Sequence, residues 1–144
     1  MIVEDIMQWD NIQDGVSDFL KSGYERLLSQ GEVSVTHLFS RKPGVYVFIH
    51  KKKIIYVGEC SEFHRRMYRH KKRTEVSTMR RAIGRSIFGQ AKSEKYSEAI
   101  ETKIDAYIGA LKIKYLPVAF GRKELEEYVI AKEEPIYNKY GKNA

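Results

Sequence analysis

The chain has 144 residues, of which 42% are hydrophobic and 31% charged, a balance typical of one globular domain with a substantial core. Lysine and arginine (26) outnumber aspartate and glutamate (19), and the net charge of +7 favours an anionic partner such as nucleic acid without requiring one. The single Cys60 excludes an internal disulfide and a multi-cysteine zinc site, so we expect a cytoplasmic protein. No run approaches the roughly 20 apolar residues of a membrane span, so we expect no membrane partner.

Residues 1–40 are predicted to form an N-terminal helical extension that packs on the domain. Apolar residues recur at helical spacing from Val16 to Leu28, and Gly31 ends the run. The extension carries no recognisable chemistry. The remaining residues, 41–144, are predicted to form one domain.

Two runs rich in β-formers open that domain, residues 44–50 and residues 54–57, and three lysines join them. Two such runs with a short polar link predict a β-hairpin, and Gly58 is expected to end its second strand.

Helices and one further strand are predicted after the hairpin. The expected helices cover about 62–73, 78–88, 94–109 and 122–133, and the expected strand lies within 111–120. Ser61 is a good N-cap for the first helix, and Pro135 prevents continuation of the last. The order predicts an α+β fold, with a small three-stranded antiparallel or mixed sheet flanked by helices.

The hairpin contains a distinctive pair of tyrosines beside a pair of glycines. Gly44 and Gly58 weaken the strands that contain them, which indicates a bend or a close approach of the backbone. Tyr46 and Tyr56 can present two hydroxyl groups near one point. Taken alone, two tyrosines in strands are more often ordinary packing residues.

The segment that follows the hairpin is strongly cationic. Arg66 and His70 are four residues apart and share one face of the predicted helix. Clustered cations repel one another unless an anion lies opposite, and phosphate suits this role, although a solvated basic face is the simpler interpretation. The candidate nucleic-acid contacts on the two basic helices are Arg65, Arg69, Lys71, Lys72, Arg73, Arg80, Arg81 and Arg85.

A carboxylate lies in the last predicted helix, at the edge of its apolar stripe. Glu126 is next to Leu125 in sequence, and this places it where the helix leaves the core. A carboxylate near a phosphate-binding surface is explained if it holds a hard divalent cation that bridges to phosphate. On position alone, an ion pair between Glu126 and a lysine is the simpler alternative.

These elements together resemble the GIY-YIG nuclease superfamily. The chain has Gly44-Val45-Tyr46 and Tyr56-Val57-Gly58, and Arg66 follows Tyr56 by ten positions. His70 comes one helical turn later, and Glu126 precedes the motif Pro135-Ile136-Tyr137-Asn138. The resemblance covers residues 43–139.

The resemblance implies a metal-dependent endonuclease that hydrolyses phosphodiester bonds in double-stranded or structured DNA. Glu126 would bind Mg²⁺ or Mn²⁺, and Tyr46 would act as general base or position the attacking water. Tyr56 would orient the nucleophile, and Arg66 would stabilise charge on the phosphoryl group. His70 would assist beside it, and Asn138 would brace the site.

One residue departs from the family pattern, and two other functions stay open. Glu59 stands where several relatives have lysine, and its negative charge can repel phosphate, point away or support a second ion. A nucleic-acid-binding module of the same fold with weak or no catalysis is the main alternative, and a protein-interaction domain is the other. The sequence does not distinguish a monomer from a homodimer.

Overall fold

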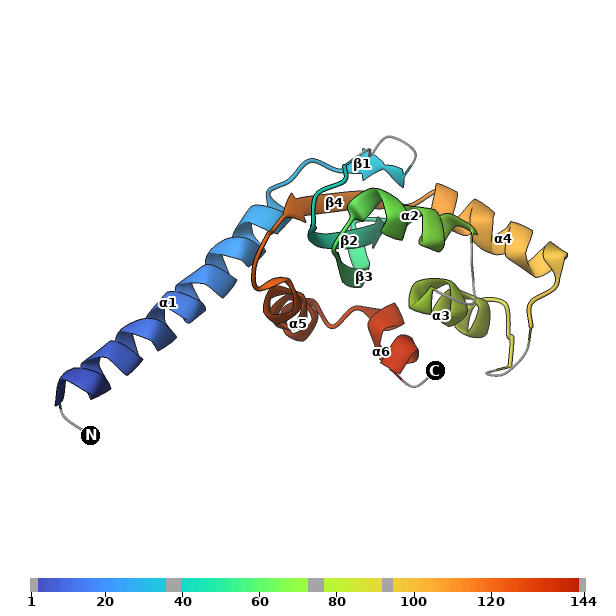
Figure 1. The fold of residues 1–144 in the computed structure, drawn as a ribbon. Coiled ribbons are helices and arrows are strands. Elements are labelled where there is room, and N and C mark those ends of the chain that lie inside the picture. The colour runs from blue at the N-terminus through green and yellow to red at the C-terminus, as the bar shows by residue number, and fades with distance from the viewer. Residues whose placement is uncertain (1–2, 36–39, 73–76, 92–94, 143–144) are drawn as a thin grey trace.

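The computed structural model describes residues 3–35, 40–72, 77–91 and 95–142. The strands are β1 (Val33–Ser34), β2 (Gly44–His50), β3 (Lys53–Cys60) and β4 (Lys112–Pro117). The helices are α1 (Val3–Leu28), α2 (Phe63–Lys72), α3 (Thr78–Ser86), α4 (Glu98–Gly109), α5 (Arg122–Glu133) and α6 (Ile136–Lys142) (Figure 1).

The strands form one antiparallel sheet in the order β1-β4-β2-β3. The prediction of an α+β fold with a small sheet between helices is confirmed, but the sheet has four strands and not three. The strand missed is β1, in which Val33 pairs with Ile113. A strand of two residues has no alternating pattern from which it can be recognised.

The hairpin of β2 and β3 turns through Lys51 and Lys52, which have φ angles of 51° and 68°. Positive φ at both central residues is the requirement of a type I′ turn, whose twist matches that of the flanking strands. The expectation that Gly58 ends the second strand is wrong, because Gly58 pairs with Tyr46 and β3 continues to Cys60.

An irregularity in the hairpin brings the two tyrosines onto one face. Phe48 pairs with Tyr56, but Ile49 pairs with Ile54, so Ile55 is an extra residue in β3. Such a β-bulge redirects side chains on the bulged strand. Tyr46 and Phe48 lie two residues apart in β2, so Tyr56, opposite Phe48, shares the face of Tyr46.

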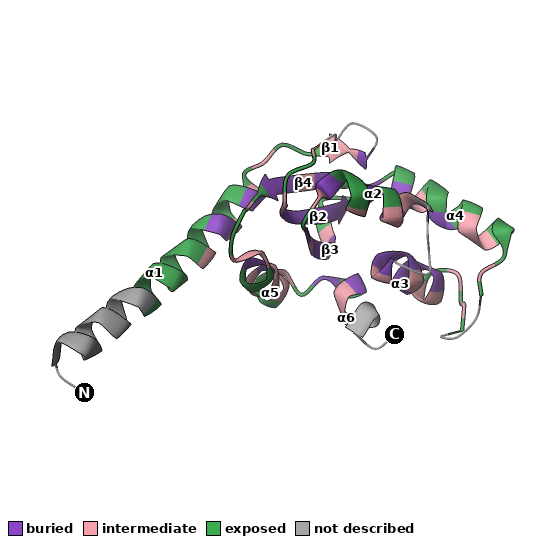
Figure 2. Ribbon diagram, viewed as in Figure 1, coloured by how far each residue is buried: buried purple, intermediate pink, exposed green. Residues whose placement is uncertain are grey.

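The sheet separates two apolar clusters, and its strands are mostly buried (Figure 2). On one face Tyr46 and Phe48 pack with Phe63 of α2 and with residues of α3 and α4. On the other face Val45, Val47 and Ile49 of β2 pack with residues of α1 and α5. The alternation along β2 therefore separates the face that carries both tyrosines from the face that anchors α5.

The helix predicted at 122–133 is found as α5, while the two helices before it are shorter than expected. The helix predicted at 94–109 begins at Glu98, because the side chain of Ser97 accepts a hydrogen bond from the backbone of Ile100 and caps it. Helix α6 was not expected, although a proline just before a helix is favourable.

The N-terminal helix α1 is attached to the domain through its last turns. Leu27 is buried between β4 and α5, and the hydroxyl of Tyr24 donates to Oε1 of Glu133 at 2.6 Å. The earlier part of the helix leads away from the sheet (Figure 1). Over the described ranges, no helix combines the length and apolar character needed to cross a membrane.

Candidate active site

Tyr46 lies at the centre of the candidate site, on β2. Its hydroxyl oxygen is 2.7 Å from Nε2 of His70 on α2, and its side chain is only 1% exposed. Gly58 lies opposite Tyr46 on β3, and a β-carbon there would collide with the hydroxyl oxygen and ring of Tyr46. The glycine leaves the space that the tyrosine ring occupies.

Both tyrosines converge on His70. The centroid of the His70 ring is 5.7 Å from that of Tyr46 and 5.6 Å from that of Tyr56, and both pairs meet edge to face. Phe48 closes a third side of the imidazole at 5.4 Å. The histidine is 2% exposed and is therefore held inside an aromatic enclosure.

Burial governs the ionisation of these three side chains. It raises the pKa of Tyr46 well above its ordinary value, and with the charge of Glu126 it raises the pKa of Tyr56 to about 12. Burial and the nearby charges of Arg66 and Arg80 lower the pKa of His70 to about 3. At neutral pH His70 is therefore an uncharged imidazole and both tyrosines are phenols.

Arg66 is the cation shared by the whole cluster. It lies on α2 one turn before His70 and is half-buried. Burial raises the pKa of Tyr46 and of Tyr56, and the charge of Arg66 opposes that rise in both. Arg66 thus acts in the direction that favours a phenolate, but burial outweighs it.

Glu126 faces the same cluster from α5. Its pKa is raised to about 7, mainly by burial and then by the charge of Glu59, while a hydrogen bond from the backbone of Glu59 and the charge of Arg66 oppose the rise. The carboxylate of Glu59 accepts a hydrogen bond from Nε of Arg122 at 3.1 Å. Glu59 is therefore paired with a cation beside Glu126.

Asn138 holds β3 from α6. Its Oδ1 accepts a hydrogen bond from the backbone nitrogen of Val57, and its Nδ2 donates to the carbonyl of Val57, both at 2.8 Å. Val57 lies between Tyr56 and Gly58. The amide therefore fixes the backbone on which Tyr56 is mounted.

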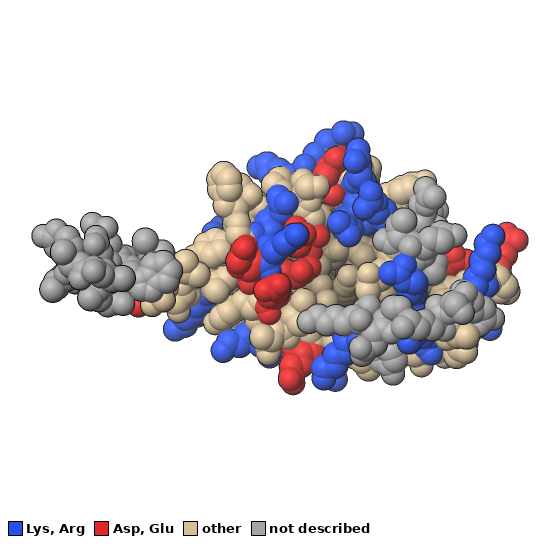
Figure 3. Space-filling model, turned by 60° about the horizontal axis from the view of Figure 1, so that its bottom comes forward, with Lys and Arg blue, Asp and Glu red and all other residues tan. Residues whose placement is uncertain are grey.

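The sequence-predicted nucleic-acid contacts divide into several groups. Arg65 is exposed on α2. The partly exposed members are Arg69, Lys71, Arg81 and Arg85. One guanidinium nitrogen of Arg85 is buried without a hydrogen-bond partner among the described residues. Arg73 and the side chain of Lys72 lie outside the described part. In Figure 3, acidic side chains gather in the middle of the visible face, and basic ones lie around them.

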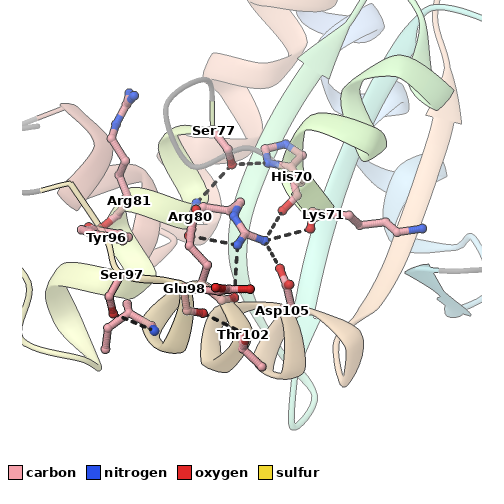
Figure 4. Close-up of polar contacts among 12 residues, drawn as sticks. His70, Lys71, Ser77, Arg80, Arg81, Tyr96, Ser97, Glu98, Thr102 and Asp105 are labelled. Carbon is pink, nitrogen blue, oxygen red and sulfur yellow. Dashed lines mark hydrogen bonds and ion pairs between the residues drawn. The ribbon is translucent and has the colours of Figure 1, made fainter.

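Arg80 is not a surface residue, which corrects its prediction as a nucleic-acid contact. Its side chain is 1% exposed, and its guanidinium donates to the carbonyls of His70 and Lys71 (Figure 4). It also pairs with Asp105 at 2.7 Å and Glu101 at 3.2 Å on α4. Arg80 ties the end of α2 to α3 and α4 and has no access to a ligand.

Ser77 is the residue of this region that sequence reasoning missed. It is the N-cap of α3, where its hydroxyl oxygen accepts a hydrogen bond from the backbone nitrogen of Arg80 at 3.1 Å. The same oxygen is 2.7 Å from Nδ1 of His70 (Figure 4). A serine just before a predicted helix is a capping signal, but its contact with the histidine is visible only in three dimensions.

The part of the chain that contains the candidate site is similar to a known protein family. A family model described as the GIY-YIG catalytic domain matches residues 38–144, which include β2 to β4, α2 to α6 and all the residues of the candidate site. A comparison with curated proteins found no match.

Several solved structures are similar over most of the chain. The magnesium-bound GIY-YIG N-terminal endonuclease domain of UvrC from Thermotoga maritima is 20% identical, with a TM-score of 0.45, and the match covers 70% of this chain and 88% of that one. A point mutant of that domain is 19% identical with a TM-score of 0.43, over 70% of this chain and 88% of the mutant. Another is 17% identical with a TM-score of 0.42, over 81% and 94%.

Proposed function

Because the chain belongs to the GIY-YIG catalytic domain family, which is a family of nucleases, we propose that it is a metal-dependent endonuclease that hydrolyses phosphodiester bonds in DNA. The observation that carries the proposal is the convergence of Tyr46, Tyr56 and Arg66 with His70 and Glu126 around one point. These side chains come from β2, β3, α2 and α5. Cytoplasmic location is part of the proposal and rests on the lone reduced Cys60.

The donor chemistry near Glu126 suits Mg²⁺ or Mn²⁺. Within the described ranges no three His, Cys, Asp or Glu residues gather into a ligand cluster. Mg²⁺ does not need one, since it keeps several waters and takes one or two carboxylates together with substrate phosphate. Glu126 would supply that carboxylate. When bound, the cation supplies charge neutralisation at a phosphate oxygen.

Arg66 contributes the fixed positive charge of the proposed site. Phosphoryl transfer depends mainly on positioning and on stabilisation of charge at the phosphoryl oxygens. A guanidinium matches phosphate in shape and stays protonated at every relevant pH. Arg66 would therefore bind the scissile phosphate between the tyrosines and Glu126.

Tyr46 would act on the attacking water, either as its general base or by positioning it. A buried phenol is a weak base, and the charge of Arg66 would favour the phenolate of Tyr46 against the effect of its burial. Tyr56 would orient the water and phosphate from the neighbouring strand. Asn138 would maintain the position of Tyr56 through the backbone of Val57.

The surface that receives DNA would be formed by α2 and the exposed part of α3. The candidates for phosphate contacts there are Arg65, Arg69, Lys71, Arg81 and Arg85. The sequence adds Lys72 and Arg73 as candidates. Binding through such contacts weakens steeply as salt rises, because condensed counterions are released. Each active site would cut one strand, whether the protein is a monomer or a homodimer.

Scission of supercoiled plasmid tests the proposal, with Mg²⁺, Mn²⁺ or EDTA added to wild type, Glu126→Ala and Glu127→Ala. Glu127 is the neighbouring, exposed carboxylate and serves as the matched control. We expect cation-dependent nicking by wild type and Glu127→Ala and none by Glu126→Ala. Intact DNA binding without cleavage by wild type would instead favour a catalytically weak or inactive binding module. Equal cleavage by all three proteins would reject Glu126 as the ligand.

A further inference from the structure

The turn between β2 and β3 carries three consecutive lysines, Lys51, Lys52 and Lys53, which together are called the lysine turn below. All three are exposed. Lys112, which pairs with Ile49 at the same end of the sheet, is exposed as well. This end of the sheet is separate from the basic helices α2 and α3, so its positive charge is not explained by the proposed site.

The backbone of the lysine turn is unusual for lysine. The φ angles of Lys51 and Lys52 are 51° and 68°, in the left-handed region. Residues other than glycine avoid this region, because their β-carbon comes too close to the following carbonyl oxygen. Type I′ turns therefore prefer Asn-Gly or Asp-Gly at these two positions. Lysine at both positions gives up stability that Asn-Gly would provide, which indicates that the charge itself has a use.

Carboxylates of the chain do not neutralise the lysine turn. Glu32 and Glu133 line the hollow of about 410 Å³ beside it. No ion pair joins the lysine turn to a carboxylate among the described residues. Glu133 instead accepts a hydrogen bond from the hydroxyl of Tyr24. The three ammonium groups are therefore available to an anion that comes from outside the protein.

The lysine turn lies within reach of a DNA duplex held at the candidate site. Lys51 follows Tyr46 by five residues along β2, and a strand rises about 3.3 Å per residue, so the two are about 17 Å apart along the sheet. Successive base pairs of B-DNA are about 3.4 Å apart, so this distance corresponds to about five base pairs. The repeated phosphates of DNA match a row of unpaired lysines better than a single small anion does.

We propose that the lysine turn is a second phosphate-binding surface, which holds the DNA backbone about five base pairs from the bond that is cut. The inference rests on the proposed nuclease function, which supplies the partner. Contacts from lysine to phosphate carry no sequence information, so the lysine turn contributes affinity and orientation and not base recognition.

The variant Lys51→Asn/Lys52→Gly separates the charge from the geometry of the turn. It removes two charges but supplies the residues that a type I′ turn prefers, so its melting temperature should rise by about 2–4 °C. Its DNA affinity should fall. Fluorescence anisotropy with a labelled duplex several helical turns long, in EDTA to prevent cleavage, measures the affinity at several salt concentrations. The slope of log affinity against log salt should become shallower by about 1–2, since each phosphate contact contributes about 0.9. An unchanged slope would overturn the proposal.

Two control variants distinguish a local contact from an effect of net charge. Lys51→Arg/Lys52→Arg keeps both charges and should keep the wild-type slope. Lys21→Gln/Lys103→Gln removes two charges from exposed positions on α1 and α4, and its slope should stay close to that of wild type. An equal change in this variant and in Lys51→Asn/Lys52→Gly would mean that net charge alone acts, and the lysine turn would lose its role.

The same measurements separate failure of this inference from failure of the proposed function. Cleavage by wild type with an unchanged slope in Lys51→Asn/Lys52→Gly would reject the lysine turn alone. A shallower slope in the variant, without cleavage by wild type, would support the lysine turn and reject the nuclease. Loss of binding to phosphatidylserine vesicles in the variant, with the wild-type DNA slope retained, would assign the turn to a membrane surface and overturn the proposal.

Discussion

The ring of Tyr46 lies over Gly58, its partner across the pairing of β2 and β3, so closely that a β-carbon on Gly58 would overlap it. Gly58 is not among the described residues with positive φ. A glycine is therefore required here for the space that it leaves and not for an unusual backbone conformation. The glycine of one strand and the tyrosine of the other are therefore a single structural unit.

Gly58→Ala should disrupt this unit. The added methyl group must displace the Tyr46 ring, which breaks the hydrogen bond to His70 and costs about 1–3 kcal/mol of unfolding free energy. Urea unfolding and plasmid nicking measure the two effects. Gly15→Ala is the control, since Gly15 lies in a helix with open space around it and the change should stabilise the helix slightly. Full activity in Gly58→Ala would contradict the role of the glycine.

Tyr46→Phe should lose activity and keep its fold. Removing the hydroxyl removes the group that would act on the attacking water, and general-base contributions are about 100-fold or more. Tyr115→Phe is matched to it, because Tyr115 is also buried on the sheet but its hydroxyl donates to the carbonyl of Lys42. Single-turnover cleavage should fall in the first variant and stay unchanged in the second. Comparable rates in the two variants would exclude Tyr46 from the chemistry.

Arg80→Leu should destabilise the protein without a specific loss of DNA contacts. It removes the buried guanidinium that donates to the carbonyls of His70 and Lys71 and pairs with carboxylates of α4. A hydrogen bond to a charged group contributes about 1.5–3 kcal/mol. Arg65→Ala is the contrasting variant, because the Arg65 side chain is 71% exposed. We expect nearly unchanged stability for Arg65→Ala and a shallower dependence of DNA affinity on salt. Thermal melting and binding titrations at several salt concentrations distinguish the two. If Arg80→Leu melted at the same temperature as wild type, the structural role of Arg80 would be refuted.

His70 should make the stability of the protein depend on acid. Burial first, then the charge of Arg66, lowers its pKa to about 3 in the folded state, from an ordinary value of 6.5. Between those two values the unfolded chain binds a proton that the folded protein does not, so stability is lost as pH falls from about 6.5 to about 3.

The comparison of wild type with His70→Gln isolates this effect. At pH 7.5 the variant should be less stable, because it loses the hydrogen bonds to Tyr46 and Ser77. The difference in unfolding free energy should shrink as pH is lowered toward 4, since only wild type pays for the buried neutral imidazole. A difference that stays constant from pH 7.5 to pH 4 would contradict the lowered pKa.

Glu59 and Arg122 should adjust the affinity of Glu126 for a divalent cation. Burial and the charge of Glu59 raise the pKa of Glu126 to about 7, so protons should compete with Mn²⁺ below that pH. Glu59→Gln should move the loss of Mn²⁺ affinity to lower pH, and Arg122→Ala, which leaves Glu59 unpaired, should move it to higher pH. Calorimetric titration at several pH values measures both shifts. Movement of both variants in the same direction would exclude this electrostatic coupling.

The hairpin and α5 were predictable because their signals are local. Residues 44–50 are rich in β-formers, and the helix at 122–133 lies between Gly121 and Pro135. The end of β3 was not predictable, because Gly58 stays in the strand only through its pairing with Tyr46. The short β1 likewise exists through its pairing with β4.

The candidate site shows the same division. Tyr46, Arg66 and Glu126 have spacings that a sequence displays, and the structure brings them together. Arg80 looks like its exposed neighbours in sequence, and its burial is set by Glu101 and Asp105, which lie on another helix. A run of basic residues does not reveal which member has acidic partners elsewhere in the chain.

Asn138 has a consequence for the behaviour of the protein at high concentration. The strand β3 lies at the end of the sheet order, and an end strand offers unpaired backbone groups to which another chain can add. The amide of Asn138 occupies both backbone groups of Val57, as a neighbouring strand would. We therefore expect this side chain to hinder edge-to-edge pairing of β3 with another chain, in addition to supporting the site.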